Sequence, residues 1–123
     1  MIQELKSYLI AQGYENISVD FMPDEKLTPE AVYLGQWDHS LGEFHDGTSS
    51  RYVQIQVRRY NAEGARADCN RILALLDSGT EEEVIHLSPK VWCIGRPTRG
   101  ATIISRTNNT TTYYGEVTLW GET

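Results

Sequence analysis

Two histidines flanked by aspartates stand in one polar stretch and could bind a metal ion. The order Asp-His, five residues, His-Asp spans residues 38–46, and zinc and non-haem iron sites use these imidazole and carboxylate groups. The two pairs are not one helical or tight turn apart, and no third ligand is evident nearby. The pattern therefore favours a solvated polar loop. A metal-dependent hydrolase built on His39, His45 and Asp46 is the weakest of three functional hypotheses.

Other catalytic patterns give no firmer lead. The sequence has no Gly-x-Ser-x-Gly motif and no Walker-type loop. The basic, glycine-containing segment 95–100 could bind phosphate, but a hairpin turn is the simpler interpretation. The acidic run 81–83 indicates either a solvated loop or an electronegative surface, and His86 is expected at a sheet surface. We therefore expect no catalytic, cofactor-binding or metal-binding residues, no cofactor, and no enzymatic activity.

The two cysteines, Cys69 and Cys93, are too few for the disulfide framework of a small secreted domain. We expect both thiols to be free and buried, in a reducing compartment. The longest purely apolar run, residues 72–76, is far shorter than the about 20 residues needed to span a bilayer. Residues 1–6 include an early acid and no apolar segment of the secretory type. The sequence thus favours a cytosolic protein that does not enter a membrane.

The composition is that of one globular domain spanning residues 1–123. Hydrophobic residues make up 40% and charged residues 23% of the chain, which argues against disorder. Acidic residues outnumber basic ones 17 to 11, for a net charge of -6. This balance argues against a sequence-independent nucleic-acid binder, whose affinity comes from neutralising phosphates.

Hydrophobic periodicity predicts an α+β domain with the element order α-β-β-β-α-β-β-β-β. We expect a mixed, mostly antiparallel sheet with two helices packed on one face. Residues 36–50 have no sustained period and form a long polar connection, and 96–100 is a predicted turn. The predicted helices are 2–12 and 62–76, and the predicted strands are 17–21, 31–35, 52–60, 84–87, 91–95, 101–106 and 113–120.

The alternation over residues 52–60 is the strongest local signal. Odd-numbered residues 53 to 57 are apolar and share one face, whereas even-numbered residues 54 to 58 are polar. The polar face suggests either solvent or a partner subunit. The arginines at its end are either exposed with their stems on the sheet or part of an intersubunit ion pair. The aromatic residues of the 36–50 connection either pack under the loop or anchor an interface. The candidate interface residues are therefore Trp37, Phe44, Gln54, Gln56, Arg58 and Arg59.

Three features together resemble the minor capsid and tail-terminator proteins of long-tailed bacteriophages. The first is a short N-terminal helix followed by the break Met22-Pro23-Asp24. The second is the strand 31–35, AVYLG, before a variable polar loop. The third is the strand 52–58, YVQIQVR, which leads into a helix with small residues and the apolar segment 72–76. The resemblance covers residues 1 to 79, and the remainder matches in being rich in predicted strands.

This resemblance implies a structural virion protein that completes the phage tail and joins it to the head connector. Such proteins form rings, typically hexamers, through which DNA passes. The implied partners are the tail tube protein and a head-completion or connector protein, with no specific nucleic-acid binding, and the implied location is the virion or the host cytoplasm during assembly. An acidic lumen would repel the DNA backbone. The alternative from another class is a stand-alone small ligand-binding or regulatory α+β domain.

Overall fold

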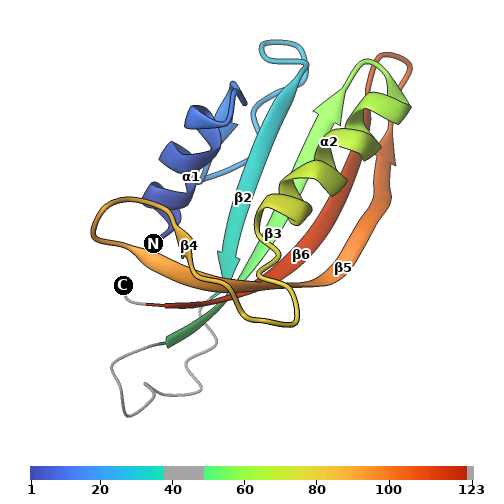
Figure 1. Cartoon of the computed structure of the whole chain (residues 1–123). Helices are drawn as coiled ribbons and strands as arrows, with labels where there is room; N and C mark the ends of the chain where they lie inside the picture. Colours follow the sequence, from blue (N-terminus) through green and yellow to red (C-terminus); the bar gives the residue numbers. More distant parts are fainter. Residues whose placement is uncertain (38–48, 122–123) are drawn as a thin grey trace.

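A computed structural model of the chain describes residues 1–37 and 49–121 (Figure 1). Over this part the fold is α+β, as predicted, and the two predicted helices are both present. The elements in chain order are α1 (Ile2–Ala11), β1 (Ile17–Ser18), β2 (Ala31–Trp37), β3 (Ser49–Arg59), α2 (Ala62–Leu75), β4 (Ile85–His86), β5 (Trp92–Arg106) and β6 (Thr111–Gly121).

The described strands form one six-stranded sheet in the order β1-β2-β3-β6-β5-β4. The β1–β2 pair is parallel and the other four pairs are antiparallel. The sheet is mixed and mostly antiparallel, which confirms the prediction. The long strands curl around the helices, and α1 and α2 lie on the same, concave side (Figure 1). We call the side that the helices cover the inner face and the opposite side the outer face.

The hydrophobic core lies between the helices and the inner face. Alternate residues of β3, Val53, Ile55 and Val57, are buried there, as the sequence alternation predicts. The register places Ile55 between Leu34 of β2 and Gly115 of β6. Buried residues of α1 and of α2 belong to the same cluster as Leu34 and Ile55, so one core holds both helices. The helices contribute the buried side chains Leu5, Leu9, Ala65, Cys69, Ile72 and Leu73.

Helix α2 begins at the predicted cap. The side chain of Asn61 accepts a hydrogen bond of 3.0 Å from the backbone N–H of Gly64, which satisfies one of the unpaired donors at the helix start. The buried stripe of the helix begins with the small residues Ala65 and Cys69. Their size lets the helix approach the sheet closely, as the sequence predicts.

Two glycines of the sheet mark where α2 comes closest. A Cβ placed on Gly115 of β6 would lie 2.6 Å from Cδ1 of Leu73. A Cβ placed on Gly95 of β5 would overlap the carbonyl oxygen of Leu76, just after the end of α2. The backbone N–H of Gly95 donates to the hydroxyl of Ser78. Helix–sheet packing therefore requires glycine at position 95, whereas a side chain at position 115 would force Leu73 to move.

The predicted turn at 96–100 is wrong. Strand β5 runs without interruption from Trp92 to Arg106 and joins the two strands predicted at 91–95 and 101–106. Its pairing with β6 shifts register at three places, between 97 and 99, 99 and 102, and 103 and 105. Such bulges accommodate Pro97 and Gly100 inside a strand, because the extra residue need not pair. The turn residues thus mark bulges rather than a chain reversal.

The two outermost strands are shorter than predicted. Of the segment 17–21, only Ile17 and Ser18 pair with β2, and of 84–87 only Ile85 and His86 pair with β5. Each of these strands has a neighbour on one side alone. An alternating pattern specifies which face of a strand is buried, but it does not specify how many residues find a partner.

Candidate functional site

The outer face of the sheet is covered by neither α1 nor α2, and it carries polar and aromatic side chains. The strand register aligns them in rows across β2, β3, β6 and β5, such as Tyr33, Gln56, Tyr114 and Thr102. The next row contains glutamine, glutamate and arginine. Its side chains are half-buried or exposed. The residues that define this outer face are Tyr33, Tyr52, Gln54, Gln56, Arg96, Arg99, Tyr114, Glu116 and Trp120.

Arginines stack on aromatic rings across this face. The guanidinium carbon of Arg96 lies 6.0 Å from the centre of the Trp120 ring, and that of Arg99 lies 5.8 Å from the Tyr114 ring. Arg99 also lies 3.9 Å from a carboxylate oxygen of Glu116. Stacking limits the freedom of an arginine side chain before binding. Aromatic residues and arginine are the types enriched at protein–protein interfaces.

Gln54 and Gln56 lie on the outer face, as the alternation predicts. Their side chains are joined by a hydrogen bond of 2.8 Å, in which Gln56 Nε2 donates to Gln54 Oε1. Both are half-buried at the centre of the face. Their contact with a neighbouring subunit or the tail tube stays a prediction.

Arg58 is the last polar residue on the outer side of β3, and it is buried, which contradicts the expectation of an exposed side chain. An ion pair of Arg58 with another subunit stays a prediction. Only 7% of the residue is exposed. Its guanidinium donates to the carbonyl oxygens of Pro23, Thr28 and Pro29 at 2.6 to 2.8 Å. These bonds satisfy backbone acceptors that no strand pairs in this segment. Arg58 therefore fixes the connection between β1 and β2 over one end of the outer face.

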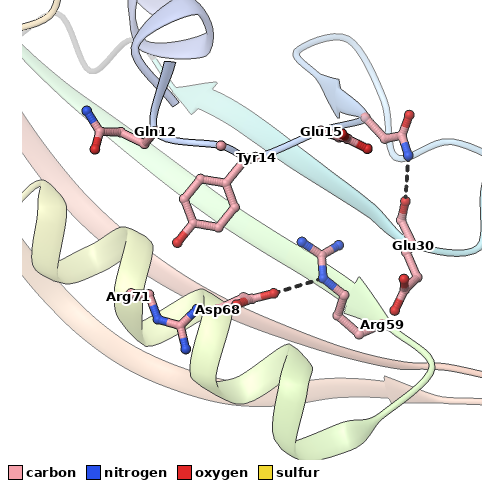
Figure 2. A pocket seen from close by; sticks show the side chains of 9 residues that line it. Gln12, Tyr14, Glu15, Glu30, Arg59, Asp68 and Arg71 are labelled. Carbon is pink, nitrogen blue, oxygen red and sulfur yellow. Dashed lines mark hydrogen bonds and ion pairs between the residues drawn. The ribbon is translucent and has the colours of Figure 1, made fainter. Parts of the chain in front are cut away.

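Arg59 faces the other way and lies in a cleft of about 410 Å³ between α1 and α2 (Figure 2). Its Nε donates to Asp68 Oδ2 of α2 at 3.0 Å, and the same carboxylate accepts from Arg71 at 2.9 Å. The interface predicted for Arg59 therefore competes with an ion pair inside the chain. The cleft is lined by Gln12, Gly13, Tyr14, Glu15, Asn16, Glu30, Arg59, Asp68 and Arg71.

The ring of Tyr14 points into this cleft toward Asp68 and Arg71 (Figure 2). Burial, and next the negative charge of Asp68, raise the pKa of the Tyr14 hydroxyl. The hydroxyl therefore stays protonated at neutral pH and can donate a hydrogen bond. Asp68 and Arg71 lie three residues apart on α2, a spacing that an ion pair along one helix face could have indicated. Tyr14 comes from a separate segment after α1, and no spacing in the sequence relates it to that pair. The arrangement suits the binding of a small polar molecule more than proton transfer, since Asp68 is held between two guanidinium groups.

The cysteines are buried and free, as predicted. Burial raises the pKa of the Cys69 thiol to about 12 and that of Cys93 to about 11. Since the thiolate is the reactive form, neither thiol is suited to nucleophilic catalysis at neutral pH.

The metal hypothesis falls on residues outside the described part of the chain. His39, His45 and Asp46 lie there, and so does the predicted interface residue Phe44. Trp37 is the last residue of β2, where its backbone pairs with Tyr52. Among residues 1–37 and 49–121, no group of three or more histidine, cysteine or carboxylate side chains could hold a metal ion.

Comparison with known proteins finds no matching family model and no matching curated protein. In the described ranges, the helices are too short or too polar to cross a membrane. The geometry of the outer face and of the cleft therefore carries the functional argument.

Proposed function

We propose that this chain is a structural virion protein of a long-tailed phage or prophage, without enzymatic activity, that completes the tail and joins it to the head connector as a ring. The observation that carries the proposal is the outer face, on which two arginines stack on aromatic rings beside a pair of glutamines. A sheet face of this composition suits contact with another protein. The sequence resemblance over residues 1 to 79 supports the tail tube protein and the head connector as the proteins that this face contacts.

The charge of the chain supports the same role. A net charge of -6 would repel the phosphate backbone of DNA that passes through a ring of several copies. The acidic run Glu81 to Glu83 is fully on the surface. A protein that bound DNA tightly would instead need a basic surface.

The test uses tail tubes assembled from the tail tube protein encoded in the same genome. The protein is added during polymerisation, and tube length and tube ends are followed by electron microscopy. We expect a ring of density at one end of each tube and shorter tubes at higher protein concentration. Tubes whose ends and lengths are unchanged by an excess of folded protein would overturn the proposal.

A small ligand-binding or regulatory domain is the second candidate, and the cleft between α1 and α2 is the observation that favours it. Tyr14, Arg59 and Arg71 offer donors around one carboxylate, an arrangement that could bind a small molecule with acceptor groups.

A thermal-shift screen with small carboxylates and phosphates tests this candidate. A ligand that raises the melting temperature of the wild type and of Arg66→Gln, but not of Arg71→Gln, would support it. Both arginines are exposed on α2, and only Arg71 lines the cleft. An equal response of all three proteins would place the ligand elsewhere and overturn the candidate.

A further inference from the structure

Strand β5 leaves a long part of its outer edge without a neighbouring strand. Over the described residues, β4 pairs only with Trp92 and Cys93 of β5. Ser78 and Asn70 contact the backbone at Gly95 and Ala101. Beyond that point, residues 102–106 have β6 on one side and no described strand on the other. An unpaired edge of this kind is a template for pairing with another chain.

The side chains of this edge are unusually apolar for a surface. Ile103 is 44% exposed and Ile104 is 46% exposed. Ile103 pairs with Tyr113 and Ser105 pairs with Thr112, so Ile104 is the extra residue of a bulge. The sequence of residues 102–106, TIISR, is rich in the β-branched residues that strands favour.

The opposite edge of the sheet is also incompletely paired. The segment 17–21 alternates as a strand, but its pairing with β2 ends at Ser18. Asp20 is exposed, and Phe21 is 67% exposed. A five-residue strand pattern therefore has only two residues in the sheet.

The two edges carry opposite charge. Strand β5 contains three arginines and no acidic residue. At the other edge, residues 15–24 include the three exposed acids Glu15, Asp20 and Asp24 and neither lysine nor arginine. Pairing of two β5 edges would bring arginine against arginine, whereas pairing of unlike edges brings opposite charges together.

We propose that copies of this chain associate head to tail, with segment 17–21 of one copy adding as a strand to residues 102–106 of β5 in the next. Phe21 then covers Ile103 or Ile104, and Asp20 lies near Arg106. Such a contact joins two different surfaces, so it generates rings when the rotation between copies closes. Ring closure rests on the proposed function, but the pairing of the two edges does not.

Disulfide cross-linking tests the pairing directly. A Phe21→Cys variant and an Ile103→Cys variant are mixed, oxidised and analysed without reducing agent. The native cysteines do not interfere, because both are buried. We expect the mixed dimer to form at least tenfold faster than the dimer of Phe21→Cys with Val84→Cys. Val84 is the matched control, because it is similarly exposed, at 49%, and lies just before β4, outside segments 17–21 and 102–106.

Charge reversal supplies a second readout. Asp20→Arg and Arg106→Glu should each weaken self-association, measured by sedimentation velocity, by about tenfold, and the double variant should restore it. Mixed dimers no faster than the Val84→Cys control, together with no rescue, would overturn the pairing. Tube capping is a separate assay. If the protein caps tubes but its edges do not pair, only this inference is refuted. If the edges pair but tubes are not capped, only the proposed function is refuted.

Discussion

The two faces of the sheet are built from the same strands but differ in what holds their side chains. On the inner face, Val53, Ile55 and Val57 are closed off by helices and belong to one core cluster. On the outer face, the intervening Gln54 and Gln56 bond to each other. Folding therefore constrains the side chains of the inner face strongly and leaves those of the outer face available for binding.

The largest expected effect tests this difference within one strand. Ile55→Ala removes a fully buried side chain, and we expect it to lower the free energy of unfolding by about 2 to 5 kcal/mol. The adjacent Gln54→Ala lies on the outer face, and we expect a change of about 0.5 kcal/mol or less. Urea denaturation measures both. Equal losses of unfolding free energy in the two variants would contradict the claim that folding constrains the inner face more than the outer face.

Close packing of α2 on the inner face predicts the next effect. Gly95→Ala places a methyl group against the carbonyl oxygen of Leu76, and we expect a loss of about 1 to 3 kcal/mol. Gly100→Ala in the same strand is the control, because a Cβ there meets no atom within 4 Å. Thermal unfolding of the two variants compares them. A control as unstable as Gly95→Ala would show that the strand, and not the helix contact, forbids a side chain.

Arg58 belongs to the outer face of β3, but its side chain is buried like those of the inner face. Arg58→Gln removes charge-assisted hydrogen bonds to the carbonyl oxygens of Pro23, Thr28 and Pro29. We expect a loss of about 1.5 to 3 kcal/mol and faster hydrogen exchange in residues 23–29. The exposed Arg66→Gln should change neither. Unaltered exchange in the Arg58 variant would show that this arginine does not hold the segment.

The smallest effect concerns the thiols beneath the inner face. At pH 7 the raised pKa values of Cys69 and Cys93 keep both in the thiol form, and burial excludes a reagent. We expect a thiol-specific dye to label the native protein only at the rate at which the protein unfolds locally around the two cysteines. In urea, the dye should label both thiols immediately. Rapid labelling of the native protein would show that the inner face is not closed.

Much of the fold could be predicted, because each long element has its own periodicity. The stripe that starts at Ala62 and the alternation over 52–60 each indicate an element with a buried face. Strand β5 was mispredicted, since Pro97 and Gly100 are typical of turns and also of bulges. Whether they reverse the chain depends on pairing with β6, which is not local.

The candidate site was predictable only in part. Alternation placed Gln54 and Gln56 on the outer face, but it could not show that Arg58 bends onto carbonyl oxygens about 30 residues away in sequence. The stacked pair of Arg99 and Tyr114 depends on register across a bulge. Long-range contacts of this kind leave no spacing in the sequence.

The most direct test of the central claim changes the outer face without touching the core. In Gln54→Lys/Gln56→Lys, two long charged side chains stand at its centre, and the net charge rises by two. The exposed Glu81→Lys makes the same change of charge elsewhere and serves as control. Electron microscopy of tail tubes should show that the double variant has lost end binding by at least tenfold, with an unchanged melting temperature, while the control binds like the wild type. A double variant that caps tubes as well as the control would contradict the account.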